Sequence, residues 1–387
     1  MPRLRGGMRR DASAHPHAQV QPAGRVGRGG AGGKPHLGPH LARDRLRRLR
    51  RVHVRRRGAL AVRGRAQARL RDRQRACEGA SPRRRARDRD GRRLRATARG
   101  GPAMTDLTGW SVERLHQDHA QGLRMAVEHY DSATDHQRIR VFENPTFGRI
   151  MTLDGVVQVT EADNFIYHEM LTHVPILAHG SARRVLIVGG GDGGMAREVL
   201  KHDGVAQVTM VEIDGAVVDF CKTYLPDISA GAFDDPRLDL VIADGADFMR
   251  QNRDAYDVII VDSTDPVGPG EVLFTDTFYG HARARLAEGG ILVTQNGVPF
   301  LQGEELTNTM RAFRALFSDA TCYLATVPTY AGGPMAFGWG TDGGARGVDL
   351  QALRDRFAAS GIATEYYTPE VHLGAFALPP YVARLIP

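Results

Sequence analysis

Short apolar runs alternate with helical segments between residues 184 and 294, and this alternation constrains the fold more than any other feature. Each apolar run has the length of a buried strand, and the stretches between have helical periodicity. The expected strands are Arg184–Val188, Ala206–Ile213, Leu238–Ala243, Tyr256–Val261 and Gly290–Thr294, and the clearest helices are Gly215–Tyr224 and Thr275–Leu286. The pattern predicts an α/β fold with a doubly wound parallel sheet, which binds ligands at the carboxyl ends of its strands.

A small antiparallel β domain is expected before this sheet. Residues 123–160 alternate apolar and polar positions, as half-buried strands do. Phe147–Leu153 and Val156–Thr160 flank Asp154-Gly155, a dipeptide typical of a two-residue hairpin turn. A helix over residues 163–178 would lead into the larger sheet. We therefore predict a β domain at 104–175 and an α/β domain at 176–387.

Residues 1–103 differ in composition from the rest of the chain. They carry 31 Lys and Arg against 6 Asp and Glu and have no Phe, Trp or Tyr, whereas the remainder has 21 basic and 38 acidic residues. Such a segment cannot bury enough apolar surface to offset the entropy of ordering, so we expect a disordered extension. A nucleic-acid-binding tail would contain interleaved aromatic residues, and a targeting peptide would be shorter and more clearly helical. We favour an extension outside the working protein, with Met104 as the natural start.

The net charge of +8 therefore does not indicate a nucleic-acid partner. No run of 18 apolar residues predicts a membrane span, and the start lacks the apolar stretch of a secretory signal. The three cysteines, Cys77, Cys221 and Cys322, form no CxxC pair. This usage favours a reducing, cytoplasmic location over a disulfide framework or a cysteine zinc site.

A glycine-rich loop follows the first expected strand. The segment 189–194 satisfies G-x-G-x-x-G between a strand and a helix, with Gly189, Gly191 and Gly194 at the motif positions. Glycines let the backbone approach a ligand closely, although a plain tight turn would also use them. Glu212 ends the next strand about 20 residues on, where a carboxylate accepts hydrogen bonds from ribose hydroxyls. The two features together predict a nucleoside site in a Rossmann-like fold.

Asp192 within this loop argues against NAD. A dinucleotide would place its pyrophosphate against the loop, where a carboxylate would repel it. A sulfonium nucleoside carries positive charge instead, and the same loop with an acidic strand end is the pattern of methyltransferase-type folds that bind S-adenosylmethionine. Asp192 also suits a helix N-cap, and the two roles are compatible.

Two further strand ends carry acidic residues. Asp244-Gly245 ends the third strand, where such folds hold the adenine amino group, although Asp-Gly is also a common turn. Asp262 and Asp265 lie three residues apart after the fourth strand, and their natural partner is a cationic amine. The Pro and Gly residues of 266–270 suggest a shaped loop over the site, with an exposed turn as the alternative.

Several segments, taken in order, resemble the polyamine aminopropyltransferase family of bacterial spermidine synthases. The matching segments are Thr134–Gln137, Leu153–Gln158, Tyr167–Met170, Gly189–Gly194, Met210–Asp214, Asp262–Phe274, Gln295–Gly297 and Pro328–Tyr330. The resemblance covers residues 104–387. It implies transfer of the aminopropyl group of decarboxylated S-adenosylmethionine to putrescine, giving spermidine and 5′-methylthioadenosine. It also implies a homodimer, with decarboxylated S-adenosylmethionine as a co-substrate and no cofactor.

The resemblance implies a role for individual residues. Asp262 would be the general base. The residues that contact the nucleoside would be Gln137, Glu212, Asp244, Gly245 and Pro269. The amine region would contain His168, Asp192 and Asp265, with further contacts from Tyr167, Gln158, Gln295 and Tyr330.

This chemistry needs no metal, because a sulfonium is already a good leaving group. The attacking amine is the difficulty, since an ammonium with an unperturbed pKa of about 10.4 has no lone pair. A carboxylate beside it can bind the cation and accept its proton during attack. Residues 168–173 resemble the zinc motif HExxH, but His168 and His173 are five apart and would not share a helical face. Cys221 lies in an apolar helical pattern and is expected in the core.

Three other functions stay open at this point. An amine N-methyltransferase of similar fold would use intact S-adenosylmethionine and move a methyl group. A dehydrogenase would bind NAD, which Asp192 disfavours. A polyamine-binding protein without activity would leave the nucleoside pattern without a purpose. The choice among putrescine, cadaverine and spermidine is also open.

Overall fold

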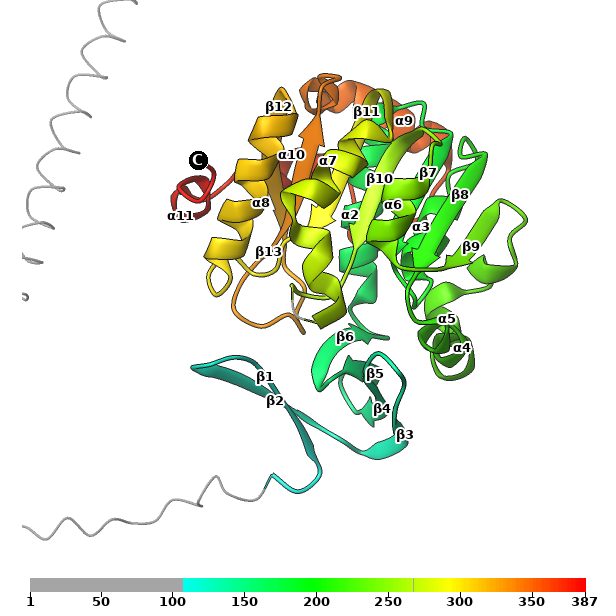
Figure 1. The fold of residues 1–387 in the computed structure, drawn as a ribbon, viewed down its shortest axis with the longest axis vertical. Helices are drawn as coiled ribbons and strands as arrows, with labels where there is room; N and C mark the ends of the chain where they lie inside the picture. The colour runs from blue at the N-terminus through cyan, green and yellow to red at the C-terminus, as the bar shows by residue number, and fades with distance from the viewer. Residues whose placement is uncertain (1–106, 267) are drawn as a thin grey trace, which may run out of the picture. The chain divides into compact units, whose positions relative to one another are not determined.

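The computed structural model describes residues 107–266 and 268–387 (Figure 1). The basic extension predicted at 1–103, with Cys77, lies outside the described residues. Among the helices of the described ranges, none has both the length and the apolar character that crossing a membrane requires.

A seven-stranded sheet forms the centre of the fold, in the order β12-β13-β11-β10-β7-β8-β9. Its parallel strands are β7 (Arg184–Gly189), β8 (Gln207–Glu212), β9 (Leu238–Ile242), β10 (Tyr256–Asp262) and β11 (Leu286–Gln295). The antiparallel strands β12 (Asp319–Ala325) and β13 (Met335–Thr341) complete it. The five predicted strands are confirmed, but the sheet is mixed and not parallel throughout. Strand β13 is buried along its whole length, but Gly338 and Gly340 break the continuous apolar run that marks such a strand in a sequence.

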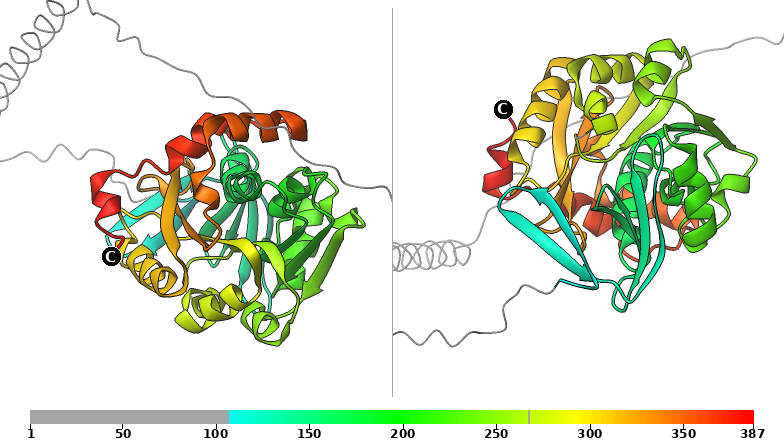
Figure 2. Two further views of the ribbon diagram at one scale, coloured as in Figure 1. Left: turned by 90° about the horizontal axis from the view of Figure 1, so that it is seen from above. Right: turned by 60° about the horizontal axis from the view of Figure 1, so that its bottom comes forward.

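Helices cover both faces of this sheet (Figure 2). One face carries α2 (Asn164–His179), α3 (Gly194–Leu200), α9 (Leu350–Ser360) and α10 (Pro369–Ala375), and the other carries α6 (Gly245–Gln251), α7 (Asp276–Ala284) and α8 (Gly303–Leu316). In β7, Val185 and Ile187 join the first core, while Leu186 and Val188 join the second. A strand buried on both faces reads as a continuous apolar run, which is why the sequence reveals it. The shorter helices are α5 (Pro226–Ser229) and α11 (Pro380–Ala383).

Two smaller antiparallel sheets precede the central one. The first is a hairpin of β1 (Trp110–His116) and β2 (His119–Arg124), and the second has β3 (Val127–Ala133), β4 (Arg138–Asn144), β5 (Gly148–Leu153) and β6 (Val156–Thr160). The predicted turn joins β5 to β6, with positive φ angles of 49° at Asp154 and 84° at Gly155. Two positive φ angles define the type I′ turn that suits a tight hairpin.

Helix α4 (Gly215–Tyr224) links the central sheet to the four-stranded one. Its residues Val217, Phe220 and Cys221 form a core with apolar side chains of β4 and β5. Cys221 is fully buried, with Sγ 3.6 Å from Sδ of Met151. The prediction of a core cysteine is confirmed, and α4 fixes the small sheet over the carboxyl edge of the large one.

Candidate active site

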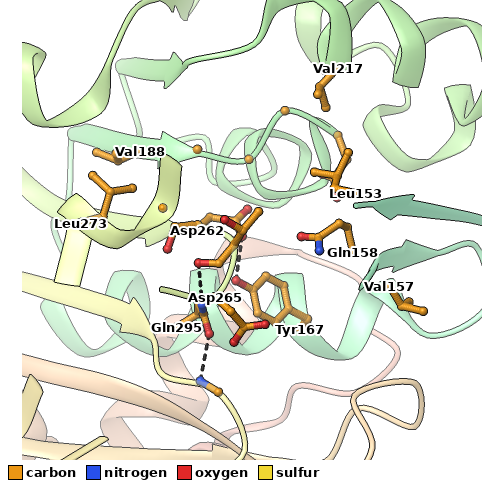
Figure 3. Close-up of a pocket in the computed structure, with 18 of the residues that line it drawn as sticks. Leu153, Val157, Gln158, Tyr167, Val188, Val217, Asp262, Asp265, Leu273 and Gln295 are labelled. Atoms are coloured by element: carbon orange, nitrogen blue, oxygen red, sulfur yellow. Dashed lines mark hydrogen bonds between the residues drawn. The ribbon is translucent and has the colours of Figure 1, made fainter. Parts of the chain in front are cut away.

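A pocket opens at the carboxyl ends of β7, β8, β10 and β11, and residues of β1, β5 and β6 line its opposite side (Figure 3). The predicted site residues that line it are Gln137, Gln158, Tyr167, His168, Gly189, Gly191, Asp192, Glu212, Asp244, Gly245, Asp262, Asp265, Gln295 and Tyr330. Gly194 does not line the pocket, and the side chain of Pro269 lies outside what the structure describes. Segments from residue 137 to residue 330 therefore converge on one space.

The first loop needs glycine because other backbone and side chains come close to it. Gly189 has a φ of 88°, and a Cβ on it would overlap the carbonyl oxygen of Asp262. The next residue, Gly190, donates its N–H to that same oxygen over 3.0 Å. A Cβ on Gly191 would lie 2.9 Å from Oε2 of Glu212. The loop can therefore lie directly against the acidic ends of β8 and β10.

Glu212 lies at the end of β8 and is 7% exposed. Its Oε1 accepts a 2.9 Å hydrogen bond from the backbone N–H of Asp214. Burial, with the nearby Asp214 and Asp262 carboxylates, raises the pKa of Glu212 to about 7. Asp214 in turn accepts hydrogen bonds from Thr134 Oγ1 (2.8 Å) and Gln137 Nε2 (3.3 Å). These bonds hold the predicted Gln137 beside the carboxyl end of β8.

The third predicted strand end forms the wall next to Glu212. Asp244 caps helix α6, since its Oδ1 accepts a 2.9 Å hydrogen bond from the Asp247 N–H. Gly245 follows, and a Cβ there would lie 2.6 Å from Cγ1 of Val188. Val188 and Leu273 lie together on this side of the pocket in Figure 3. Leu273, which sequence reasoning missed, comes from a 3₁₀ helix at Gly268–Phe274 and adds an apolar surface to the pocket.

Asp262 ends β10, and its side chain lines the pocket. The Tyr167 hydroxyl donates a 2.7 Å hydrogen bond to its Oδ1. Its Oδ2 accepts no hydrogen bond from the residues that the structure describes and lies 3.1 Å from a Cβ placed on Gly190. Burial and the Asp192 carboxylate raise the pKa of Asp262 to about 6, although His168 and the Tyr167 hydroxyl oppose the rise. One carboxylate oxygen is therefore held and the other is available to a ligand.

His168 and Asp192 form a buried ion pair beside Asp262. Nε2 of His168 lies 3.4 Å from Oδ2 of Asp192, and the side chains are 2% and 12% exposed. Oδ1 of Asp192 accepts a 2.7 Å hydrogen bond from the Gly194 N–H at the start of α3. The residue in N-cap position is Gly193, so Asp192 binds the helix end from one position earlier. Gly194 matters here because a Cβ on it would overlap the His168 ring.

The far end of the pocket is also acidic. Asp265 accepts a 2.6 Å hydrogen bond from Nε2 of Gln302, which also donates to Glu305 over 3.2 Å. Burial raises the pKa of Asp265 and raises that of Glu305 to about 8. Glu113 and His116 reach this end from β1. Sequence reasoning missed Gln302, Glu113 and His116, because no strand-end or glycine signal marks them.

The remaining predicted residues form the side walls. The Tyr330 hydroxyl donates a 2.6 Å hydrogen bond to the carbonyl oxygen of Gln158, and its ring lies perpendicular to that of Tyr167 at 5.9 Å between centroids. Nε2 of Gln295 donates to the carbonyl oxygen of Thr264 over 3.1 Å. Gln295 therefore fixes the segment between the two acidic residues of the β10 loop.

The histidines of the zinc-like segment have separate partners. His168 faces Asp192, whereas Nε2 of His173 lies 3.1 Å from Glu198 and its Nδ1 lies 2.9 Å from His202. Across residues 107–266 and 268–387, no group of three or more His, Cys, Asp or Glu side chains is arranged to hold a metal ion. The two histidines thus do not meet at one centre.

A pocket that joins a glycine-rich loop to several carboxylates at the ends of parallel strands is the arrangement of a Rossmann-like transferase. Comparison with known proteins identifies which one: this chain belongs to the spermine/spermidine synthase family. Residues 164–350 match the family model described as "Spermine/spermidine synthase domain", and residues 109–161 match "Spermidine synthase tetramerisation domain".

Individual relatives agree with this assignment. The polyamine aminopropyltransferase of Ruegeria sp. (strain TM1040) is 71% identical over 279 residues, which cover 72% of this chain and 98% of the relative. Polyamine aminopropyltransferase 1 of Pseudomonas aeruginosa is 59% identical over 275 residues, which cover 71% of this chain and 96% of the relative. A spermidine synthase solved with the transition-state analogue AdoDATO superimposes with a TM-score of 0.68 at 37% identity, covering 72% and 94%. The spermidine synthase of Thermotoga maritima superimposes with a TM-score of 0.66 at 36% identity, and the match covers 72% of this chain and 93% of that one.

Proposed function

We propose that the chain is a polyamine aminopropyltransferase that moves the aminopropyl group of decarboxylated S-adenosylmethionine to putrescine, with Asp262 as the general base. The products are spermidine and 5′-methylthioadenosine. The observation that carries the proposal is the Asp262 carboxylate in the pocket, where the Tyr167 hydroxyl holds Oδ1 and no described residue donates a hydrogen bond to Oδ2.

The bond changes define what the residues must do. The amine nitrogen forms a bond to the terminal aminopropyl carbon while that carbon's bond to sulfur breaks, and the electron pair leaves on sulfur as a neutral thioether. One proton must leave the attacking ammonium, because only the free amine has a lone pair. A carboxylate with a pKa of about 6 is ionised at neutral pH and lies within the pocket. Asp262 can therefore bind the ammonium and take its proton during attack.

The two halves of the pocket suit the two substrates. Glu212 offers acceptors to ribose hydroxyls, and Leu273 with Val188 offers an apolar surface to adenine. Asp192 and Asp265, which line the same pocket as Asp262, offer negative charge to ammonium groups. Positioning the amine against the reacting carbon supplies much of the rate acceleration. The reaction proposed here uses no cofactor, because the sulfonium is a leaving group without assistance.

Asp192 favours this activity over methyl transfer. Its carboxylate keeps a lowered pKa, since the nearby His168 and Gly194 hydrogen bond outweigh the effect of burial. Intact S-adenosylmethionine carries a carboxylate that decarboxylated S-adenosylmethionine lacks, and like charges at close range repel. The loop therefore selects against the methyl donor.

The test is an assay of the purified full chain with each nucleoside and a panel of putrescine, cadaverine and spermidine. We expect release of 5′-methylthioadenosine from decarboxylated S-adenosylmethionine, fastest with putrescine. Methylated amine from intact S-adenosylmethionine, with no methylthioadenosine from the decarboxylated form, would contradict the proposal.

We also propose a cytoplasmic homo-oligomer. The resemblance predicts a homodimer, whereas the family model at residues 109–161 is named for tetramerisation. Light scattering on the protein as it elutes from a size-exclusion column distinguishes a dimer from a tetramer, and cell fractionation tests the location.

A further inference from the structure

Asn164, the first residue of α2, has one possible amide orientation. Its Nδ2 donates hydrogen bonds of 2.9 Å to the carbonyl oxygens of both Thr160 and Glu161. The side chain is largely buried, with 9% of the residue exposed. Turning the amide over would set its oxygen against those two carbonyl oxygens, which cannot donate. Oδ1 of Asn164 must therefore face in the opposite direction.

Oδ1 of Asn164 lies between Arg197 and His168. It accepts a 3.3 Å hydrogen bond from Nη2 of Arg197, and it lies 3.4 Å from Nδ1 of His168. Arg197 is itself fixed, since its Nε donates to Glu198 over 2.8 Å. An amide oxygen accepts and never donates, so Nδ1 of His168 must carry a proton in this contact.

The other ring nitrogen of His168 faces Asp192. Nε2 lies 3.4 Å from Oδ2 of Asp192, and that carboxylate is already committed through Oδ1 to the Gly194 N–H. With Nδ1 protonated, a neutral ring would point the lone pair of Nε2 at a carboxylate oxygen. A second proton, on Nε2, converts this repulsion into a charge-assisted hydrogen bond.

We propose that Asn164 is a positioning residue of the active site, whose side-chain oxygen holds His168 as a doubly protonated imidazolium paired with Asp192. This consequence for catalysis rests on the proposed function: the cation offsets one of the two carboxylates, Asp192 and Asp262, so both stay ionised where the amine binds. Asn164 acts only through His168, because it does not line the pocket.

The charged groups that face His168 shift its pKa in opposite directions. Burial lowers its pKa, and the guanidinium of Arg197 on α3 does the same. Asp192 in the glycine loop and Asp262 at the end of β10 oppose them, and the balance raises the pKa of His168. Tyr167, next in sequence, packs its ring at 5.6 Å from the His168 ring.

The first experiment needs no turnover. The full chain, labelled with ¹⁵N-histidine, is studied by NMR at neutral pH, and the His168 signals are identified by their loss in His168→Gln. We expect both ring nitrogens of His168 to be protonated. One unprotonated ring nitrogen in the native chain would overturn the proposal, whether or not the chain transfers aminopropyl groups.

Two variants of Asn164 provide a matched pair. Asn164→Leu and Asn164→Asp both lose the donors to Thr160 and Glu161, but only the aspartate keeps an acceptor toward His168. The titration midpoint of His168 should fall by about one to two pH units in the leucine variant, the equivalent of a hydrogen bond to a charged group. It should not fall in the aspartate variant.

Kinetics gives the second readout. In Asn164→Leu, KM for putrescine should rise several-fold, while the affinity for 5′-methylthioadenosine stays constant. Equal His168 midpoints in the two Asn164 variants would overturn the positioning role. If the leucine variant does not fold, the protonation state of the native ring still decides the proposal.

Discussion

The Tyr167 hydroxyl donates a 2.7 Å hydrogen bond to Oδ1 of Asp262, across 95 residues of sequence. Tyr167 lies on α2, and Asp262 ends β10. The bond stabilises the ionised carboxylate and so opposes the rise in pKa that burial causes. It also leaves the second carboxylate oxygen toward the pocket. Helix α2 therefore lowers the pKa of the proposed base and fixes the orientation of its carboxylate.

Tyr167→Phe should shift the acid limb of the pH profile to higher pH. The change removes the hydrogen bond that lowers the pKa of Asp262, so that pKa should rise above about 6. A hydrogen bond to a charged group is equivalent to about one pKa unit or more. The measurement is kcat/KM for putrescine against pH. Tyr279→Phe is the matched control, because that buried hydroxyl bonds Thr309 away from the pocket. An acid limb at the same pH in Tyr167→Phe and wild type would contradict the prediction.

Asp192→Asn should weaken discrimination against intact S-adenosylmethionine. The Asp192 carboxylate repels the carboxylate of intact S-adenosylmethionine. Its removal should lower the ratio of the affinity for the decarboxylated form to that for the intact form by about fivefold or more. Calorimetry with both nucleosides measures the ratio. Asp219→Asn, on the exposed side of α4, is the control. A ratio equal to that of wild type would rule out the proposed selection.

Nucleoside affinity should depend on the ionisation of Glu212. Ribose hydroxyls donate to the carboxylate, and burial raises the pKa of Glu212 to about 7 in the free protein. The ligand therefore binds the form in which Glu212 is deprotonated. Its affinity should be constant at pH values above this pKa, and at pH values well below it the affinity should fall by about tenfold per pH unit. The dissociation constant of 5′-methylthioadenosine against pH tests this. Glu212→Gln should bind more weakly and lose the slope. A flat wild-type profile around pH 7 would count against the assignment.

Much of the fold could be predicted because local patterns determine it. The strand β10, expected at Tyr256–Val261, runs to Asp262, and α4 has the predicted bounds Gly215–Tyr224. The hairpin of β1 and β2 was missed because it is short, polar and only partly buried, without a glycine turn. Strand β13 was missed because Gly338 and Gly340 interrupt its apolar run, at positions where neighbouring side chains leave no room for a Cβ.

Some residues of the site could also be predicted from local patterns, and others could not. Glu212 and Asp262 could be predicted from their places at strand ends, and Gly189 from the loop motif. Tyr167 and Gln137 came only from the resemblance, because α2 and the turn at 134–137 reach the pocket through tertiary packing. Roles for individual residues stay predictions until the variants are measured.

Gln302 and Glu113 could not be found from local rules. Gln302 reaches Asp265 across 37 residues, and Glu113 enters the pocket on a hairpin anchored by its 2.9 Å hydrogen bond to the Val157 N–H. Such contacts are set by how separate segments pack, and neither Glu113 in a short strand nor Gln302 before α8 carries a local sign of them.

Asp262→Asn should abolish most turnover while sparing nucleoside binding. The amide keeps the shape and one acceptor for the Tyr167 hydroxyl but has no basic oxygen. Loss of a general base costs about 10²–10⁴ in rate, and the lost ammonium contact should add to this. Raising the pH should restore part of the rate, because more putrescine is then free amine without help. The measurements are kcat/KM against pH and the dissociation constant of 5′-methylthioadenosine, which Glu212 should keep near its wild-type value.

The control for this variant is Asp239→Asn, an exposed carboxylate on β9. It should match wild type in both measurements. If Asp262→Asn stays within about threefold of wild type at neutral pH, far below the loss expected for a base, Asp262 is not the base. The base would then have to be sought at Asp265, the other carboxylate of the β10 loop, or at a water held by Tyr167. If Asp265 is the base, Asp265→Asn would carry the large loss instead. A loss of both turnover and nucleoside binding in Asp262→Asn would instead point to a role in shaping the glycine loop, whose Gly190 N–H bonds the Asp262 carbonyl oxygen.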